Sequence, residues 1–291
     1  MKLKDKVAII TGANRGLGEA IAQAYAKEGA HLLLAARETA LLQTSAGRVA
    51  EKLGPRSADQ KIEILATDIS KLEDVTALAN RALELFGRID ILVNNAGVYG
   101  PIGFFEEVDW QEWCDAININ LFGTVAMTRA VVPIMKKQGS GKIINLSGGG
   151  ATAPLPRFSS YAASKAAVVR LTETLAHELA PFNIEINAIA PGALNTRLLE
   201  QVIEAGPEQA GEDFYRRSLK QREEGGAPLE VGSNLAVFLA SAESDGISGR
   251  LISAVWDDWK NFPQEVERLK KSDLFTLRRI VPEDRGWESK S

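Results

Sequence analysis

Short runs of apolar residues alternate along the chain with longer segments in which apolar residues recur every three or four positions. The short runs are nearly continuously apolar, which favours strands buried on both faces of a parallel sheet. The longer segments have the spacing of helices with one apolar face. The predicted strands span 7–11, 32–36, 62–66, 89–94, 142–147, 185–189 and 251–254, and the predicted helices span 17–28, 39–53, 72–86, 110–137, 161–180 and 230–240.

The repeated order of strand, helix and strand determines the predicted architecture. Parallel neighbours need crossover connections, and right-handed helical crossovers on both faces of a sheet produce a doubly wound fold. We therefore predict an α/β fold with a single Rossmann-like, doubly wound, parallel seven-stranded sheet and helices on both faces. Residues 1–254 form this domain, and no linker or internal repeat in the sequence marks a second one.

Two segments depart from the alternating pattern. Residues 194–226 are polar and contain Gly206-Pro207 and Gly225-Gly226, so we predict an insert or lid on the substrate side. Residues 255–291 form a C-terminal extension that mixes aromatic residues with both charges. Because the aromatic residues need burial, we expect most of this extension to pack on the domain or on a neighbouring subunit.

Composition narrows the classes of partner. The net charge of −4 gives no electrostatic reason to expect nucleic acid or an anionic membrane surface. No apolar segment approaches the length that spans a bilayer, and the charged N-terminus is unlike a signal peptide. One cysteine and two histidines leave no intrachain disulfide and no expected metal site. We expect a cytoplasmic protein that acts on a small molecule.

A glycine-rich loop, Gly12-Ala13-Asn14-Arg15-Gly16-Leu17-Gly18, directly follows the first predicted strand and opens the first predicted helix. Its glycines allow a tight turn and a close approach of the backbone to a pyrophosphate, while the helix N-terminus supplies amide donors. This context predicts dinucleotide binding, and the alternative interpretation is a purely structural turn.

The Gly-x-x-x-Gly-x-Gly spacing and the motifs that follow it resemble the classical short-chain dehydrogenases/reductases, from about residue 4 to about residue 254. The further motifs are Asp68, Asn94-Asn95-Ala96-Gly97, Asn120, Tyr161-Ala162-Ala163-Ser164-Lys165, Pro191-Gly192 and Thr196. The resemblance implies an oxidoreductase with a nicotinamide cofactor that assembles as a homodimer or homotetramer. It assigns cofactor contacts to Gly12, Asn14, Arg15, Gly16, Leu17, Gly18, Arg37, Asp68, Ile69, Asn95, Ala96, Gly97, Tyr161, Lys165, Pro191, Gly192, Leu194 and Thr196.

The end of the second predicted strand favours NADP over NAD. An enzyme that uses NAD usually has an acidic residue there, to bind the ribose 2′-hydroxyl. Here the strand ends at Ala36-Arg37, and the Arg37 guanidinium can instead neutralise a 2′-phosphate. Arg15 in the glycine loop is a second cation on the same side. A solvated Arg37 beside Glu38 is the alternative interpretation.

Tyr161 and Lys165 are four residues apart at the start of a predicted helix and therefore share one face. A free tyrosine has a pKa near 10, and a neighbouring ammonium stabilises the phenolate. Tyr161 is therefore predicted to be the general acid/base. By the resemblance, Lys165 also binds the cofactor ribose, and Asn120 bends its helix and holds a water that relays protons.

The fourth catalytic position is where the sequence departs from the family. The family has a serine at the end of the fifth strand, commonly the second of an Asn-x-Ser-Ser run, that binds the substrate oxygen. Here the run is Asn145-Leu146-Ser147-Gly148, so that Gly148 stands where the serine is expected. Ser147 takes the serine's role if the flexible glycines permit a shift of one residue. Otherwise another group holds the substrate oxygen.

We expect substrate contacts from residues 98–105, 151–160 and 194–226, and the polar insert favours a polar, sugar-like or hydroxy-acid substrate. The predicted activity is the interconversion of a secondary alcohol and a ketone with NADP(H). Two alternatives stay open: a catalytically inactive nucleotide-binding regulator of the same fold, and an epimerase or dehydratase that uses NAD.

Overall fold

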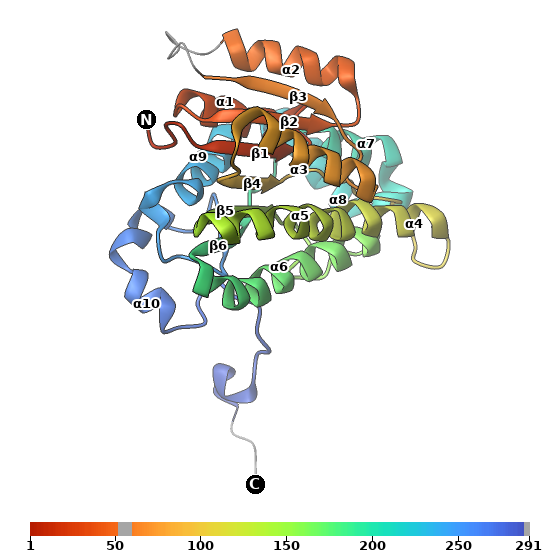
Figure 1. Ribbon diagram of the computed structural model, residues 1–291. Coiled ribbons are helices and arrows are strands. Elements are labelled where there is room, and N and C mark those ends of the chain that lie inside the picture. Colours follow the sequence, from red (N-terminus) through yellow and green to blue (C-terminus); the bar gives the residue numbers. More distant parts are fainter. Residues whose placement is uncertain (52–59, 288–291) are drawn as a thin grey trace.

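A computed structural model describes residues 1–51 and 60–287, and it contains one parallel sheet (Figure 1). The order of the seven strands is β3-β2-β1-β4-β5-β6-β7, which confirms the predicted doubly wound architecture. The direction of winding changes between β1 and β4, and ligands of such sheets bind at the carboxyl ends of the strands at this point. The strands are β1 Val7–Thr11, β2 His31–Ala36, β3 Ile62–Ala66, β4 Ile91–Asn94, β5 Gly141–Leu146, β6 Ile184–Ala190 and β7 Leu251–Ser253.

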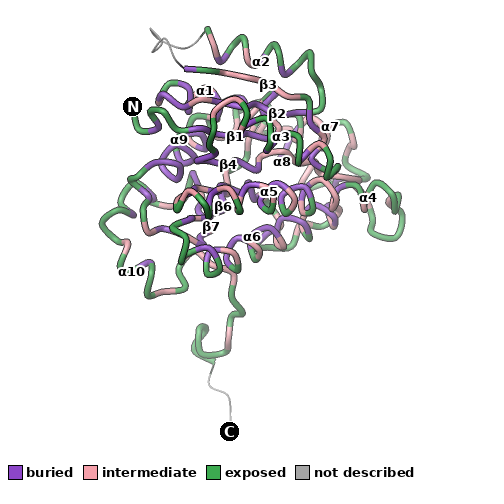
Figure 2. Tube along the Cα trace, viewed as in Figure 1, coloured by how far each residue is buried: buried purple, intermediate pink, exposed green. Residues whose placement is uncertain are grey.

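Helices cover both faces of the sheet; the central strands are buried, and the edge strand β3 is half-buried (Figure 2). One apolar cluster joins the sheet to α1, α2 and α9, and a second joins it to α3, α5 and α6. The predicted helix 39–53 is seen as far as Glu51, and its expected end lies outside the described residues. These six helices are α1 Gly16–Lys27, α2 Thr39–Glu51, α3 Leu72–Phe86, α5 Gly123–Gln138, α6 Ser159–Leu179 and α9 Leu229–Ala240.

The predicted helix 110–137 is interrupted in the structure. It consists of α4 Trp110–Ile117, a π-helical turn Asn118–Phe122, and α5. A π-helical turn bulges the helix and changes the direction in which its side chains point. The whole stretch Trp110–Gln138 is long and apolar enough to cross a membrane by length and composition alone, but α5 packs on α3, β4 and β5.

The predicted insert 194–226 is a pair of helices, α7 Arg197–Ala210 and α8 Glu212–Glu224, which pack on each other. Gly206 and Gly211 have φ of 76° and 83°, and these left-handed conformations kink α7 and separate the two helices. The pair lies over the carboxyl end of the sheet, because Val202 and Ala210 belong to the same apolar cluster as Tyr161.

The C-terminal extension is docked only in part. Trp259, Phe262 and Leu269 are buried in the main core, and the Arg250 guanidinium donates hydrogen bonds to carbonyls of residues 269, 272 and 274. After Leu277 the chain runs away from the body (Figure 1), and the side chain of Trp287 is 74% exposed. The short helices outside the sheet layers are 3-10 turns at Ala180–Phe182, Ala242–Ser244, Trp259–Gln264 and Pro282–Arg285, and α10 Val266–Lys270.

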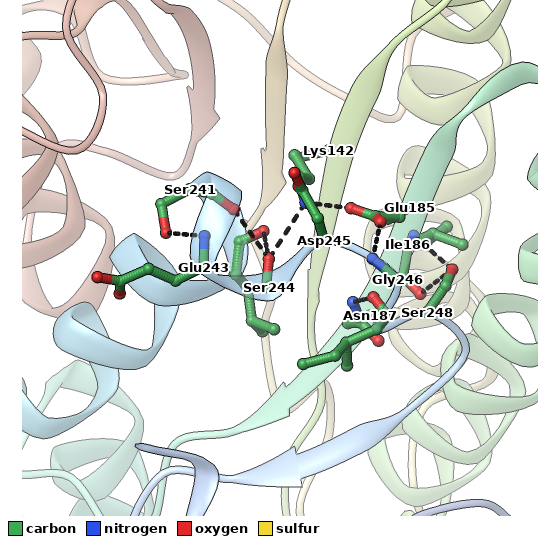
Figure 3. A network of polar contacts seen from close by, with 12 residues as sticks. Lys142, Glu185, Ile186, Asn187, Ser241, Glu243, Ser244, Asp245, Gly246 and Ser248 are labelled. Carbon is green, nitrogen blue, oxygen red and sulfur yellow. Dashed lines mark hydrogen bonds and ion pairs between the residues drawn. The ribbon is translucent and has the colours of Figure 1, made fainter. Parts of the chain in front are cut away.

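A polar network joins the amino ends of β5 and β6 to the segment after α9 (Figure 3). The Lys142 ammonium forms an ion pair with Glu185 on the neighbouring strand and another, at 2.7 Å, with Asp245 after α9. Glu185 also accepts a hydrogen bond from the amide of Gly246. Charged hydrogen bonds between largely buried groups rigidify the structure when all are satisfied. This network is structural and lies away from the carboxyl ends of the strands.

Candidate active site

The glycine loop forms a cradle between β1 and α1. A Cβ atom added to Gly12 would lie 2.8 Å from Cα of Ala96, and one added to Gly18 would overlap the Gly12 carbonyl. Asn95 holds the loop, since its Nδ2 donates to the carbonyls of Thr11 and Gly12 at 3.0 and 3.1 Å. Arg15, which precedes α1, does not cap the helix with its side chain, so the amides of the first turn face outward. The cradle therefore fits a pyrophosphate group.

Residues far apart in the sequence complete the walls of this cleft. Gly16 faces Thr196, whose Cγ2 would lie 3.4 Å from a Cβ at that glycine. Gly192 has a φ of 94° and approaches Val255 so closely that an added Cβ would lie 2.7 Å away. The structure thus brings the predicted cofactor residues of β1 and of the segment after β6 to one place, although their contacts with a cofactor stay a prediction.

The remaining predicted cofactor residues lie at the same end of the sheet. Asp68 follows β3 and accepts hydrogen bonds from the amide and hydroxyl of Ser70, at 3.0 and 2.7 Å. Partial burial opposes ionisation of the Asp68 carboxyl, but the bonds from Ser70 and the charge of Arg37 lower its pKa. Asn14, Leu17, Ile69, Ala96, Gly97, Pro191 and Leu194 are buried or half-buried around the loop and the strand ends.

The two predicted phosphate-binding cations differ in their surroundings. Arg15 forms an ion pair with Glu38, and both side chains are about half exposed. Arg37 is exposed and has no ion pair within the described residues. Arg37 is therefore the cation that is available to an anion beside β2, while Arg15 is already neutralised in part by Glu38.

Tyr161 and Lys165 lie on the inward face of α6, beside the end of β5. The Lys165 ammonium donates a hydrogen bond of 2.8 Å to the carbonyl of Leu146. Burial lowers the pKa of Lys165 to about 8 and raises that of Tyr161 well above 10, where the neighbouring phenol of Tyr99 raises it further. Tyr161 is consequently protonated at neutral pH, and the predicted stabilisation of its phenolate by Lys165 does not offset the effect of burial.

Asn120 is completely buried in the π-helical turn and joins three elements. Its Oδ1 accepts from the amide of Val98 at 2.9 Å, and its Nδ2 donates to the Val98 carbonyl and the Ser164 hydroxyl at 2.8 and 3.0 Å. The distance from an added Cβ at Gly97 to Asn120 Oδ1 would be 3.1 Å, and to Lys165 Nζ 3.4 Å. Asn120 thus positions the loop after β4 next to Lys165.

The turn after β5 places Gly148, and not Ser147, against Tyr161. A Cβ atom on Gly148 would lie 3.0 Å from Cζ of Tyr161 and would overlap its hydroxyl oxygen. Ser147 continues β5 by donating its amide to Ile189, and its buried hydroxyl has no hydrogen-bond partner among the described residues. The turn is not displaced by the one residue that would bring Ser147 to the catalytic position. The geometry therefore does not support the predicted role of Ser147.

An aromatic cluster surrounds Tyr161 and includes a residue for which the motifs assigned no role. The ring of Tyr99 contacts that of Tyr161 edge to face, with centroids 4.7 Å apart, and it packs on Phe158 at 5.1 Å. Phe214 of α8 contacts Phe158 from the insert side. Tyr99 lies in the segment 98–105, from which substrate contacts were expected, but its contact with Tyr161 was not predicted. The insert therefore covers Tyr161, which is only 6% exposed.

A cavity of about 520 Å³ opens beside this cluster. Its lining mixes apolar residues such as Ile102 and Val108 with charged residues, which are Glu107, Asp109, Glu112, Arg157 and Glu208. The Arg157 guanidinium stacks over the ring of Phe104, 3.2 Å from its centroid. Ile102 belongs to both the cavity lining and the apolar cluster around Tyr161, so the two adjoin, although Tyr161 itself does not line the cavity.

Comparison with known proteins agrees with this geometry. Residues 6–206 match the family described as short chain dehydrogenase. The chain is 35% identical over 252 residues to the 3-oxoacyl-(acyl-carrier-protein) reductase FabG of Thermotoga maritima. The aligned region covers 87% of this chain and 97% of that protein. The structure resembles levodione reductase with a TM-score of 0.78 and 30% identity, over 86% of this chain and 96% of that one. It also resembles NAD+-bound xylitol dehydrogenase, with a TM-score of 0.76 and 26% identity over 87% and 98% of the two chains.

The chain belongs to the short-chain dehydrogenase/reductase family, a family of oxidoreductases that bind NAD(P).

Proposed function

We propose that the protein interconverts a secondary alcohol and a ketone with NADP(H), and that Tyr161 exchanges the proton of the substrate oxygen. The observation that carries this proposal is the position of Tyr161 and Lys165 at the end of β5, next to the glycine cradle. The residues around the cradle would hold the cofactor, whose nicotinamide supplies or accepts the hydride when bound. Lys165 would stabilise the phenolate that forms when Tyr161 donates its proton.

The proposed substrate is a small molecule with a polar portion, such as a sugar derivative or a hydroxy acid. The charged residues of the cavity that adjoins the aromatic cluster, such as Arg157 and Glu208, support polar contacts at the outer end. The cluster of Tyr99, Phe158 and Phe214 gives the inner end an apolar wall. A substrate with its carbonyl against Tyr161 and its polar groups in the cavity satisfies both surfaces.

A panel of ketones and sugar-derived carbonyl compounds tests the activity by loss of NADPH absorbance at 340 nm. We expect saturable oxidation of NADPH with at least one compound of the panel. The position of Gly148 favours one competing function, the nucleotide-binding regulator without catalysis. Tight NADPH binding with no turnover on any compound would support the regulator and contradict the enzyme.

The proposed preference for NADP predicts the effect of the substitution Arg37→Ala. A charge-assisted hydrogen bond contributes about 1.5–3 kcal/mol, so loss of Arg37 should weaken NADPH binding about 10- to 100-fold and leave NADH binding nearly unchanged. Fluorescence of the reduced nicotinamide measures both affinities. Arg81→Ala, which removes an exposed arginine on α3 paired with Glu84, is the matched control and should change neither affinity. An equal loss for NADH and NADPH would contradict the role of Arg37.

We also propose that the chain associates with itself and that its last residues contact a second copy. Beyond Leu277, Arg278 binds Asp273 and Asp284 at 2.7 and 2.6 Å, which gives the segment internal order, while Ile280 remains 60% exposed. We expect light scattering after gel filtration to show a dimer or tetramer of the full chain, and fewer copies per oligomer for a chain that ends at Leu277. The same number of copies for both chains would show that the segment does not hold the oligomer together.

A further inference from the structure

The active site contains two neighbouring phenol groups, those of Tyr161 and Tyr99. Their rings are in edge-to-face contact at an interplanar angle of 73°; Tyr161 is buried and Tyr99 is half-buried. Neither hydroxyl makes a hydrogen bond to any residue in the described part of the chain. Neither oxygen is among the buried unpartnered atoms of the described residues, so both hydroxyls are open to water and available to a ligand that replaces it. Two such groups side by side point to a ligand oxygen between or beside them.

The backbone that carries Tyr99 is held firmly in place. Asn120 binds both the amide and the carbonyl of Val98, the preceding residue, at 2.9 and 2.8 Å. The Ser160 hydroxyl donates to the carbonyl of Tyr99 itself at 3.3 Å. Because Ser160 directly precedes Tyr161 on α6, the two tyrosines are positioned relative to each other by the same part of the helix. A rigid placement of this kind suits a group that must bind a reacting atom.

The site lacks the hydroxyl that the family places after β5. Gly148 has no side chain, and the Tyr161 hydroxyl occupies the space where its Cβ would be. Ser147 does not replace the missing group, since its hydroxyl is buried and makes no hydrogen bond to Tyr161. The substrate oxygen therefore needs a second hydrogen-bond donor from elsewhere, and Tyr99 is the unbonded donor in contact with Tyr161.

We propose that the Tyr99 hydroxyl donates a hydrogen bond to the substrate oxygen, in place of the hydroxyl that Gly148 lacks. This inference rests on the proposed function. During reduction of a ketone the carbonyl carbon gains the hydride and the oxygen takes the proton of Tyr161. Tyr99 gives up no proton: it stabilises the negative charge that develops on the oxygen and is unchanged at the end. In alcohol oxidation the same bond holds the carbinol oxygen, and Tyr161 accepts the carbinol proton after its own proton has passed to solvent.

Binding of 2,2,2-trifluoroethanol to the complex of the protein with NADP+ tests the proposal without turnover. This alcohol presents the oxygen of a substrate but is a poor hydride donor, and ¹⁹F NMR measures its dissociation constant. Tyr99→Phe keeps the ring and its packing and removes only the hydroxyl. We expect trifluoroethanol to bind about 5- to 10-fold more weakly, as for loss of one hydrogen bond, with unchanged affinity for NADP+. For the carbonyl compound most rapidly reduced by the wild type, kcat should fall about 100-fold.

Two further variants separate the possible outcomes. Tyr25→Phe removes a phenol hydroxyl that binds the carbonyl of Ala236 in the core, so it should lower Tm but leave trifluoroethanol binding unchanged. Tyr161→Phe should weaken trifluoroethanol binding as well. If only Tyr161→Phe weakens it, the role of Tyr99 is overturned and the proposed function stands. If neither active-site variant weakens it, or the wild-type complex does not bind the alcohol, both proposals fail.

Discussion

Replacement of Tyr161 by phenylalanine is expected to lower kcat for carbonyl reduction by about 10²- to 10⁴-fold, the range contributed by a positioned general acid. The ring, its contact with Tyr99 and the helix α6 all remain, so the loss isolates the proton that the hydroxyl provides. Steady-state kinetics with NADPH and the best carbonyl substrate give kcat, and nicotinamide fluorescence gives the affinity for NADPH. Tight NADPH binding should persist in the variant.

The pH dependence of the reduction rate of the wild type also tests whether Tyr161 is the acid. Burial lowers the pKa of Lys165 to about 8, so its ammonium is present below that pH and is lost above it. Since the ammonium stabilises the phenolate left on Tyr161, the rate of reduction should decline as the pH rises through about 8. Turnover by Tyr161→Phe at the wild-type rate, with the same pH profile, would show that Tyr161 is not the acid.

The substitution Gly148→Ala is expected to cause the second-largest loss. Its Cβ would overlap the Tyr161 hydroxyl, which is the end of a buried ring packed edge to face on Tyr99. Tyr161 must therefore move, and a displacement of about 1 Å in a reacting group can lower the rate about 100-fold. Kinetics as for Tyr161→Phe measure the loss, and the spectrum of the folded protein checks that the fold is kept.

Gly149→Ala provides the matched control in the same turn. The nearest atom to its Cβ would be Cδ2 of Leu155 at 3.9 Å, an ordinary contact, and Gly149 is absent from the glycines with positive φ. We therefore expect kcat within about twofold of the wild type. Equal activities of the Gly148 and Gly149 variants would mean that the space occupied by the Tyr161 hydroxyl has no catalytic importance.

The fold was predictable from the sequence because burial on both faces of a parallel sheet leaves a continuous apolar signal. The run 7–11 coincides with the fully buried β1, and the helix 72–86 with α3; the run 62–66 coincides with β3, although that edge strand is only half-buried. The π-helical turn around Asn120 was not visible, since the apolar spacing of 110–137 continues through it. The helices of the insert were also missed, because their faces are mostly polar and the glycines suggested a loop.

The site was predictable as far as it depends on local motifs. The glycine loop and the pair Tyr161 and Lys165 lie as expected beside the end of β5. The contact of Tyr99 with Tyr161 and the pairing of Arg15 with Glu38 depend on how separate elements meet. Neither follows from spacing along the chain, because side chains 62 and 23 residues apart are brought together by the crossovers of the sheet.

Transfer of deuterium from NADPH labelled at both C4 positions shows whether the protein moves a hydride to a carbonyl carbon. The labelled cofactor is incubated with wild-type protein and the carbonyl compounds of the panel, and the products are analysed by mass spectrometry and ¹H NMR. We expect one deuterium on the carbinol carbon of each product molecule, and an amount of labelled product equal to the NADPH consumed. Absence of deuterium on that carbon for every compound, in a protein that binds NADPH, would contradict the proposed activity.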